Sequence, residues 1–166
     1  MNRKVILGVT GHRDIVVTDK LKRNITNLLV DLCSKNKEVI LMSPLADGAD
    51  RLVAKLFLNL QSTFQGLKLI VPIPFEQTRY MEDFDDASKQ EFLEYIKVAN
   101  SVVEVKNTEG CPYRSVGVYV ADKSDILLAL WDGTFNHKSG GTGDIVQYAR
   151  DKNMEVVHFV CSRRYE

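Results

Sequence analysis

The sequence lacks a long apolar run, an excess of charge of either sign and a framework of cysteines. Within its 166 residues no apolar segment is long enough to span a membrane. Basic and acidic side chains both number 22, which argues against a protein that binds the nucleic-acid backbone through bulk charge. The first residues form a strand and a turn too early to be a signal peptide. We therefore expect a soluble protein in the cytoplasm.

The three cysteines are odd in number and far apart, which excludes a disulfide framework and a metal site with recognisable ligand spacing. Cys33 lies in a helical pattern and Cys161 at the end of a predicted strand, and we expect both to pack in the interior. Cys111 lies in a loop, and the sequence shows no base beside it. We predict no metal site and no resident cofactor.

Two common nucleotide-binding motifs are also absent. The stretch "GVTGHR", residues 8–13, follows the first apolar run but lacks the G-x-G-x-x-G spacing, and no acidic residue ends the second strand to hold a ribose. No Gly-Lys-Ser/Thr follows the first strand, so the chain has no Walker A loop there. A ligand site in this protein must therefore be built from other residues.

What is present is a regular alternation of β-rich runs and helical patterns, with continuous apolar strands. This pattern predicts an α/β fold: one doubly wound, Rossmann-like domain over residues 1–166, with a mostly parallel sheet of about six strands and helices on both faces. We predict strands at 4–9, 38–43, 67–73, 101–105, 126–131 and 155–160. Helices are predicted near 19–34, 49–60, 113–123 and 142–152, and another follows the segment 74–84 and ends near residue 99.

Glycines and polar residues collect after these strands, where open α/β sheets bind their ligands. Small residues that lead into a helix N-terminus form an anion site, and we interpret residues 140–143 as a phosphate cradle. Glycine-rich turns and helix caps are also common at such places, so each loop alone has a purely structural explanation. The candidate ligand-binding residues are Gly11, His12, Arg13, Ser43, Gly48, Asp50, Arg79, Gly140, Gly141, Thr142 and Gly143.

These loops resemble the SLOG superfamily, the Rossmann-like group that includes the DNA-processing proteins DprA/Smf and the LOG phosphoribohydrolases. "SPLADGAD", residues 43–50, is similar to the Ser-Gly-x-Ala-Arg-Gly-Ile-Asp motif of DprA. Residues 11–13 resemble the Gly-Ser-Arg turn that follows the first strand of that family. Ser124-Asp125, the strand after it and "GGTGD", residues 140–144, resemble the LOG pattern. The likeness implies a nucleotide-binding domain and, as in LOG proteins, a homo-oligomer.

The sequence departs from both patterns. Asp47 stands where the DprA motif has an arginine, and this loss of positive charge argues against DNA binding. Arg114 lies about two residues upstream of the position of the LOG arginine. Ile145 occupies the position of the LOG glutamate, and the nearest acid is Asp144.

Three functions remain open. In the first, the domain senses or processes a nucleotide or an NAD- or ADP-ribose-like ligand, whose phosphates lie on the N–H groups of Gly141 to Gly143 and on Arg13. Arg79 closes over them, and Asp50 caps the second helix or accepts a ribose hydroxyl.

In the second, a LOG-like hydrolase releases the base from a nucleoside 5′-monophosphate. Asp144, or else Asp132, then stabilises the oxocarbenium-like transition state, while Arg114 or Arg13 holds the phosphate. His12 could carry a proton or bind the phosphate in such a site. The third function, least favoured, is DprA-like binding of single-stranded DNA.

Overall fold

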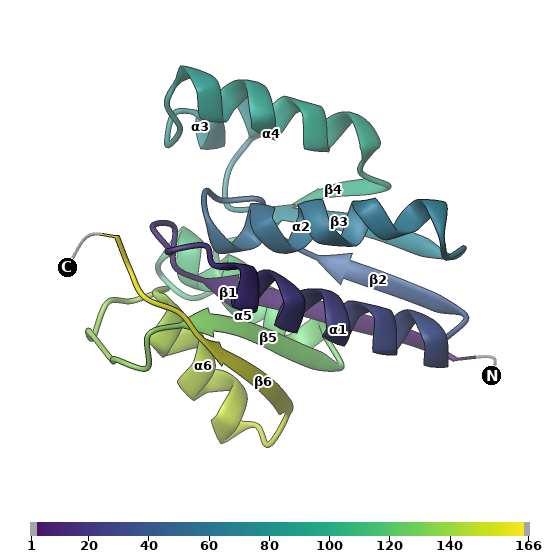
Figure 1. The fold of residues 1–166 in the computed structure, drawn as a ribbon. Coiled ribbons are helices and arrows are strands. Elements are labelled where there is room, and N and C mark those ends of the chain that lie inside the picture. The colour runs from purple at the N-terminus through teal and green to yellow at the C-terminus, as the bar shows by residue number, and fades with distance from the viewer. Residues whose placement is uncertain (1–2, 165–166) are drawn as a thin grey trace.

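The computed structural model describes residues 3–164, which form a sheet of six parallel strands in the order β4-β3-β2-β1-β5-β6 (Figure 1). This arrangement confirms the predicted Rossmann-like α/β fold. β1 runs two residues beyond its predicted end, because Thr10 and Gly11 still pair with Ala129 and Leu130 of β5. The strands are β1 (Lys4–Gly11), β2 (Glu38–Met42), β3 (Leu67–Ile73), β4 (Ser101–Glu104), β5 (Ile126–Trp131) and β6 (Glu155–Val160).

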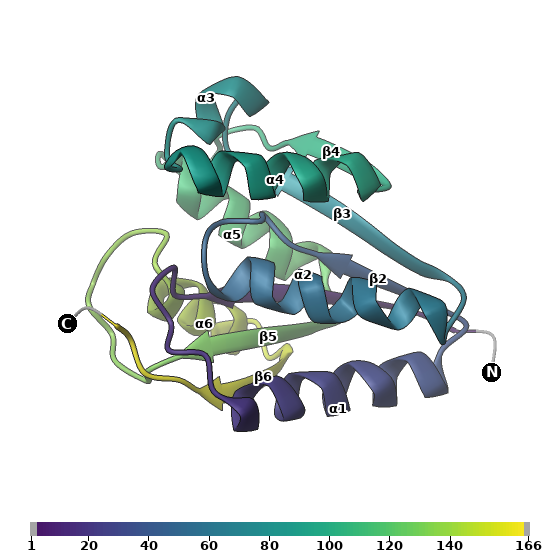
Figure 2. The ribbon, with the colours of Figure 1, turned by 45° about the horizontal axis from the view of Figure 1, so that its top comes forward.

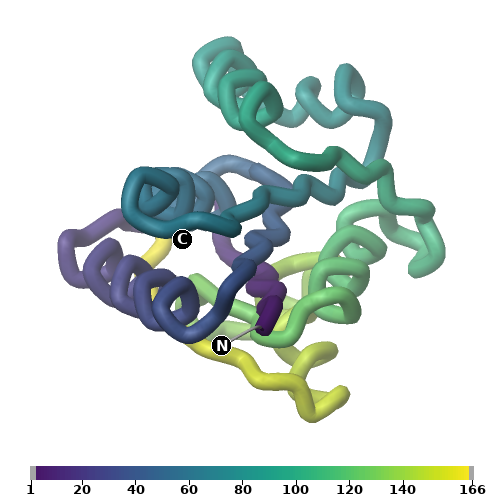
Figure 3. Tube along the Cα trace, turned by 90° about the vertical axis from the view of Figure 1, so that its right-hand side faces the viewer, coloured from purple at the N-terminus to yellow at the C-terminus, as the bar shows by residue number. Residues whose placement is uncertain are grey.

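Helices cover both faces of the sheet, as predicted. Figures 2 and 3 show α1, α2 and α4 as one layer, and α5 and α6 on the opposite face. The segment between β3 and α4 contains a short helix, α3, that the sequence pattern did not predict. Among residues 3–164 no helix is both long and apolar enough to cross a membrane. The helices are α1 (Asp19–Lys35), α2 (Ala49–Asn59), α3 (Gln77–Met81), α4 (Asp86–Val98), α5 (Pro112–Lys123) and α6 (Thr142–Asp151), with a 3-10 turn at Leu60–Ser62.

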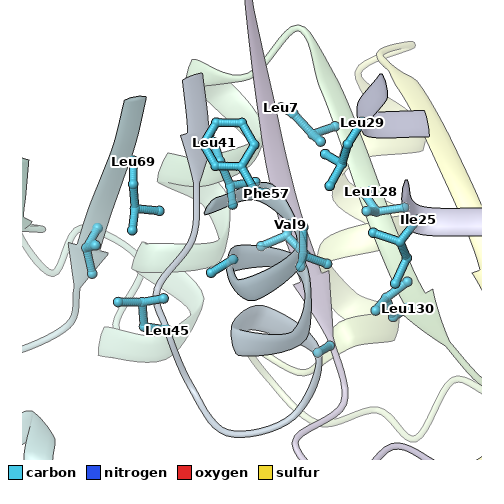
Figure 4. Close-up of a cluster of buried hydrophobic side chains, with 14 of the residues drawn as sticks. Leu7, Val9, Ile25, Leu29, Leu41, Leu45, Phe57, Leu69, Leu128 and Leu130 are labelled. Carbon is cyan, nitrogen blue, oxygen red and sulfur yellow. The ribbon is translucent and has the colours of Figure 1, made fainter. Parts of the chain in front are cut away.

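The larger part of the core lies between the sheet and the layer of α1 and α2 (Figure 4). Leu7 and Val9 of β1 point into this layer, whereas Ile6 packs on the side of α5 and α6, as the alternation of a strand requires. Gly8 lets α5 approach the sheet closely, because a Cβ at this position would lie 2.7 Å from Cγ1 of Val120. Cys33 and Cys161 are buried in the core, as predicted.

The strand order places a topological switch point between β1 and β5. From β1 the chain adds β2, β3 and β4 successively toward one edge, and then returns through α5 to add β5 and β6 on the other side. The loops after β1 and β5 consequently lead away from each other and leave a crevice at the carboxyl ends of these strands. This is the edge at which the sequence places its candidate residues.

Candidate functional site

A cleft of about 510 Å³ lies beyond the carboxyl ends of β1 and β5. This size falls within the usual range for small-molecule sites. Eight of the candidate ligand-binding residues line it: Gly11, His12, Arg13, Asp50, Gly140, Gly141, Thr142 and Gly143. Ser43, Gly48, Arg79, Arg114 and Asp144 are not among its lining residues.

Arg13 follows β1 directly and reaches the mouth of the cleft. Its side chain is 42% exposed, and its Nη2 lies 3.7 Å from Oδ2 of Asp83, which comes from the turn between α3 and α4. The hydroxyl of Tyr113 donates a 2.7 Å hydrogen bond to the same carboxylate. The guanidinium carbon of Arg13 is also 5.9 Å from the centre of the Tyr113 ring. Arg13 is thus an accessible cation that a loose ion pair holds in place.

His12 is buried beside Arg13 and connects the ends of β1 and β5. The backbone N–H of Asp132 donates a 3.2 Å hydrogen bond to Nε2 of His12. Burial, followed by the positive charge of Arg163, lowers the pKa of His12 below its ordinary value. Since Nε2 accepts a hydrogen bond, the neutral ring carries its proton on Nδ1.

Asp50, in the first turn of α2, is a buried carboxyl group in the wall of the cleft. Its Oδ2 accepts a 3.2 Å hydrogen bond from the N–H of Ala46, which precedes the helix. The recorded partner is therefore a loop N–H and not an N–H of the helix itself. Burial raises the pKa of Asp50 to about 7, although the charges of Arg13 and Arg51 oppose this shift.

Ser43 and Gly48 shape the loop behind the cleft. The hydroxyl of Ser43 donates to the carbonyl of Asp50 and accepts from the N–H of Leu45, both at 3.2 Å. Gly48 has a φ of +81°, and a Cβ there would lie 2.7 Å from the carbonyl oxygen of His12. The same oxygen accepts a 3.1 Å hydrogen bond from the N–H of Ala49, so the loop after β1 caps α2.

In the structure, two of the four N–H groups of the predicted phosphate cradle, residues 140–143, already donate hydrogen bonds within the protein. The N–H of Gly140 donates to Oδ2 of Asp144 at 2.8 Å, and that of Gly141 donates to the carbonyl of Lys138 at 3.0 Å. The N–H groups of Thr142 and Gly143, which begin α6, have no acceptor within residues 3–164. These two N–H groups are the ones that remain for an anion in the cleft.

Asp144 and Arg114, the candidate catalytic pair, contact each other. Nη1 of Arg114 lies 3.1 Å from Oδ2 of Asp144, and its Nε lies 3.7 Å from Glu109. Both residues line a second hollow, together with Phe135, His137 and Gln147. The charge of Arg114 is thus balanced by two carboxylates, and Asp144 holds the glycine loop through Gly140.

Arg79 does not line the cleft. Its guanidinium carbon lies 4.3 Å from the centre of the Phe75 ring, and its charge also acts on Tyr113, which lines the cleft. Closure of Arg79 over a bound ligand stays a prediction.

Sequence reasoning missed four charged residues that belong to this region, and one of them, Lys138, lines the cleft from the loop before α6. Arg163 lines the cleft from the segment after β6, and Asp83 lines it beside Arg13. Arg51 is buried under the loop that holds Asp50, where its Nε donates a 2.9 Å hydrogen bond to the carbonyl of Leu45. Arg163 could have been found from its place after the last strand, because the other candidate residues also follow strands. Asp83 and Arg51 lie in helical or turn segments with no comparable signal.

With this geometry in place, the chain can be compared with known proteins. A family model for YpsA, described as the YspA SLOG family, matches residues 3–163. The chain belongs to this SLOG family. No curated protein matches the sequence significantly.

Among solved structures, the SLOG chain is similar to DNA processing protein A from Helicobacter pylori, whose structure is described as showing a unique single-stranded DNA binding mode. The match has a TM-score of 0.60 at 18% sequence identity, and it covers 98% of this chain and 67% of the other. At this identity the likeness concerns the fold. It agrees with the family match and with the resemblance seen in the loop sequences.

Proposed function

We propose that this SLOG domain binds a nucleotide or nucleotide-derived ligand, such as an NAD- or ADP-ribose-like molecule or a nucleoside phosphate, as a sensor or nucleotide-processing module. The observation that carries the proposal is the convergence of Arg13 with the N–H groups of Thr142 and Gly143 on one cleft at the switch point. A guanidinium group and a helix N-terminus both favour an anion, and they come from different elements.

The other groups in the cleft suit the rest of a nucleotide. The Tyr113 ring lines the same cleft and offers a face for a base, while Asp50 offers a buried carboxyl group to a hydroxyl or amino group. Neutral His12 can donate from Nδ1 without adding charge. In this proposal one phosphate lies between Arg13 and the start of α6.

A thermal-shift and calorimetry panel tests the proposal directly. AMP, ADP, GMP, GDP, NAD and ADP-ribose are added to the wild-type chain, to Arg13→Ala and to Arg23→Ala, which removes an exposed arginine of α1. A ligand at roughly 100 times its Kd adds about 2.7 kcal/mol to the free energy of unfolding. We expect at least one nucleotide to raise the Tm of the wild type and of Arg23→Ala. Arg13→Ala should bind it about tenfold more weakly. No shift with any nucleotide would refute the proposal.

A hydrolytic function remains a second proposal, which the contact between His12 and Asp132 favours. Oδ1 of Asp132 lies 3.3 Å from Nε2 of His12, so a carboxylate contacts a titratable ring that lines the cleft. Release of free base from nucleoside 5′-monophosphates, followed by chromatography, tests this reaction. Loss of base release in Asp132→Asn, together with its retention in Asp144→Asn, would assign the reaction to His12 and Asp132. Absence of base release would leave binding as the function.

Binding of single-stranded DNA, which is described for the Helicobacter pylori protein, is the third proposal. Fluorescence anisotropy with a labelled oligonucleotide at several salt concentrations tests it. Tight binding with a steep salt dependence would favour DNA over a small nucleotide. The chain has equal numbers of basic and acidic side chains, so we expect weak binding of the oligonucleotide.

A further inference from the structure

The segment that follows β6 returns to the loop after β1 and is fixed there by backbone contacts. The N–H of Val16 donates a 2.8 Å hydrogen bond to the carbonyl of Ser162, and the N–H of Arg164 donates a 2.6 Å bond to the carbonyl of Asp14. Ile15 and Arg163 form an antiparallel bridge between these bonds. In Figure 1 this yellow segment leaves β6 and runs beside the purple chain that links β1 to α1. Residues 161–164 are therefore held in a fixed position at the edge of the sheet where the cleft lies.

Through this attachment Arg163 brings a second arginine into the cleft. Its Nε donates a 2.9 Å hydrogen bond to Oδ1 of Asp14, and its side chain remains 33% exposed. Within residues 3–164 the structure records no acceptor for its two terminal nitrogens. The outer edge of the guanidinium group is thus available to a ligand, while Asp14 fixes its position.

The two arginines approach the cleft from different sides of the end of β1. Arg13 pairs with Asp83, which lies on the side of α3 and α4. Arg163 lies on the side of β5 and β6, where its charge acts on His12 and Asp132. Lys138 also lines the cleft, from the loop before α6. The cationic groups that line the cleft therefore come from three separate segments of the chain.

We propose that Arg163 binds a second anionic group of the ligand, so that the site prefers a nucleotide with a diphosphate over one with a single phosphate. This inference rests on the proposed function, in which Arg13 and the start of α6 hold the first phosphate. A diphosphate places two charged groups side by side, and each can accept a charge-assisted hydrogen bond from its own arginine. A monophosphate would leave one of the two arginines without a contact to the ligand.

Calorimetry with matched pairs of probes tests the inference: AMP against ADP, and inorganic phosphate against pyrophosphate. We expect the wild type to bind the diphosphate of each pair more tightly. Arg163→Ala should weaken binding of the diphosphate about tenfold and change binding of the monophosphate less than twofold. Arg163→Lys should recover part of the loss, because it keeps the charge but not the planar fork. Equal losses for both probes, or no loss for either, would overturn the inference.

Asp14→Asn separates a binding role of Arg163 from a structural one. If Arg163 acts by binding the ligand, Asp14→Asn removes the negative charge that partly neutralises the guanidinium group but keeps an oxygen that can accept the hydrogen bond from Nε, so affinity for the diphosphate should stay equal or rise. If the ion pair merely holds the loop, Asp14→Asn should weaken binding as Arg163→Ala does, and the inference would be wrong. Failure of the wild type to bind any of the probes would refute the proposed function as well. Loss of all binding in Arg13→Ala with no effect of Arg163→Ala would overturn the inference alone.

Discussion

The backbone N–H of Asp132 lies 3.2 Å from Nε2 of His12, and this hydrogen bond joins the end of β5 to the end of β1 across the switch point. The bond requires an unprotonated Nε2, and burial together with Arg163 keeps the pKa of His12 low. A histidine pKa that is lower in the folded than in the unfolded chain stabilises the fold at neutral pH. This stabilisation is lost as the pH falls below the ordinary value and through the folded pKa.

Removal of the Arg163 charge should raise the pKa of His12. An NMR titration of the His12 ring in the wild type and in Arg163→Ala measures this change directly, and Arg163→Lys serves as the charge-conserving control. We expect the titration of His12 to move to higher pH in Arg163→Ala and to stay near the wild-type position in Arg163→Lys. Identical titrations in all three proteins would show that the charge of Arg163 does not act on His12.

Asp50 should make the protein less stable as the pH rises through the acidic and neutral range. Its folded pKa of about 7 lies above that of an unfolded aspartate, so the folded chain holds a proton that the unfolded chain has released. Between these two values the free energy of unfolding should fall by up to about 1.4 kcal/mol for each pH unit, and then level off above the folded pKa.

The variant Asp50→Asn removes this dependence, because a neutral amide keeps an oxygen for the N–H of Ala46. Urea unfolding from pH 4.5 to pH 8.5 should show Asp50→Asn to be more stable than the wild type at the alkaline end, with the difference shrinking toward acid. Asp31→Asn, on the exposed side of α1, is the control and should leave the pH dependence of the wild type intact. If the free energy of unfolding of Asp50→Asn and of the wild type changed with pH in the same way, the raised pKa of Asp50 would be contradicted.

Gly48→Ala should destabilise the protein far more than Gly133→Ala. Both glycines have positive φ angles, +81° and +88°, so each substitution carries the strain of a left-handed backbone, about 1–2 kcal/mol. A Cβ at position 133 would meet open space, whereas at position 48 it would collide with the carbonyls of His12 and Arg13. We expect a loss of about 1 kcal/mol for Gly133→Ala and of more than about 3 kcal/mol for Gly48→Ala in urea unfolding. Equal losses of stability in the two variants would mean that the loop with Gly48 and the loop with His12 and Arg13 can move apart without a cost in free energy.

The fold was predictable because its signals are local and repeated. Apolar runs marked the strands, and the helical spacing of Leu21, Ile25 and Leu29 marked the buried face of α1. The parallel arrangement then followed from the alternation of strands and helices. The ends of elements were less well defined: the pairing of Gly11 with Leu130 extends β1, and such pairing depends on a strand more than a hundred residues away.

For the site, the rule that ligands bind after parallel strands placed Gly11, His12 and Arg13 and the start of α6 on one edge, and the structure brings them to one cleft. The partners of each side chain could not be read from the sequence. That Asp144 turns to Gly140 and Arg114, and that Arg163 reaches the cleft, depends on how distant loops pack. Motif spacing carries no information about such contacts.

Asp83 should limit the affinity of the cleft for anions, because its carboxylate competes with the ligand for Arg13. Asp83→Asn keeps the size of the side chain and removes the charge that lies 3.7 Å from the guanidinium group. We expect it to tighten nucleotide binding by up to about fivefold, in line with the strength of exposed ion pairs. Calorimetry at low and high salt measures this gain, which should shrink as salt screens the pair.

Tyr113→Phe is the matched variant for this experiment, because it removes the 2.7 Å hydrogen bond to Asp83 and leaves the carboxylate in place. Without the tyrosine hydroxyl, Arg13 is the remaining side-chain partner of Asp83 within residues 3–164, so nucleotide binding should weaken or stay unchanged. Opposite signs for the two variants would show that the charge of Asp83, and not the packing around it, controls Arg13. Weaker binding in both variants would instead mean that Asp83 positions Arg13 for its ligand, and competition would be excluded.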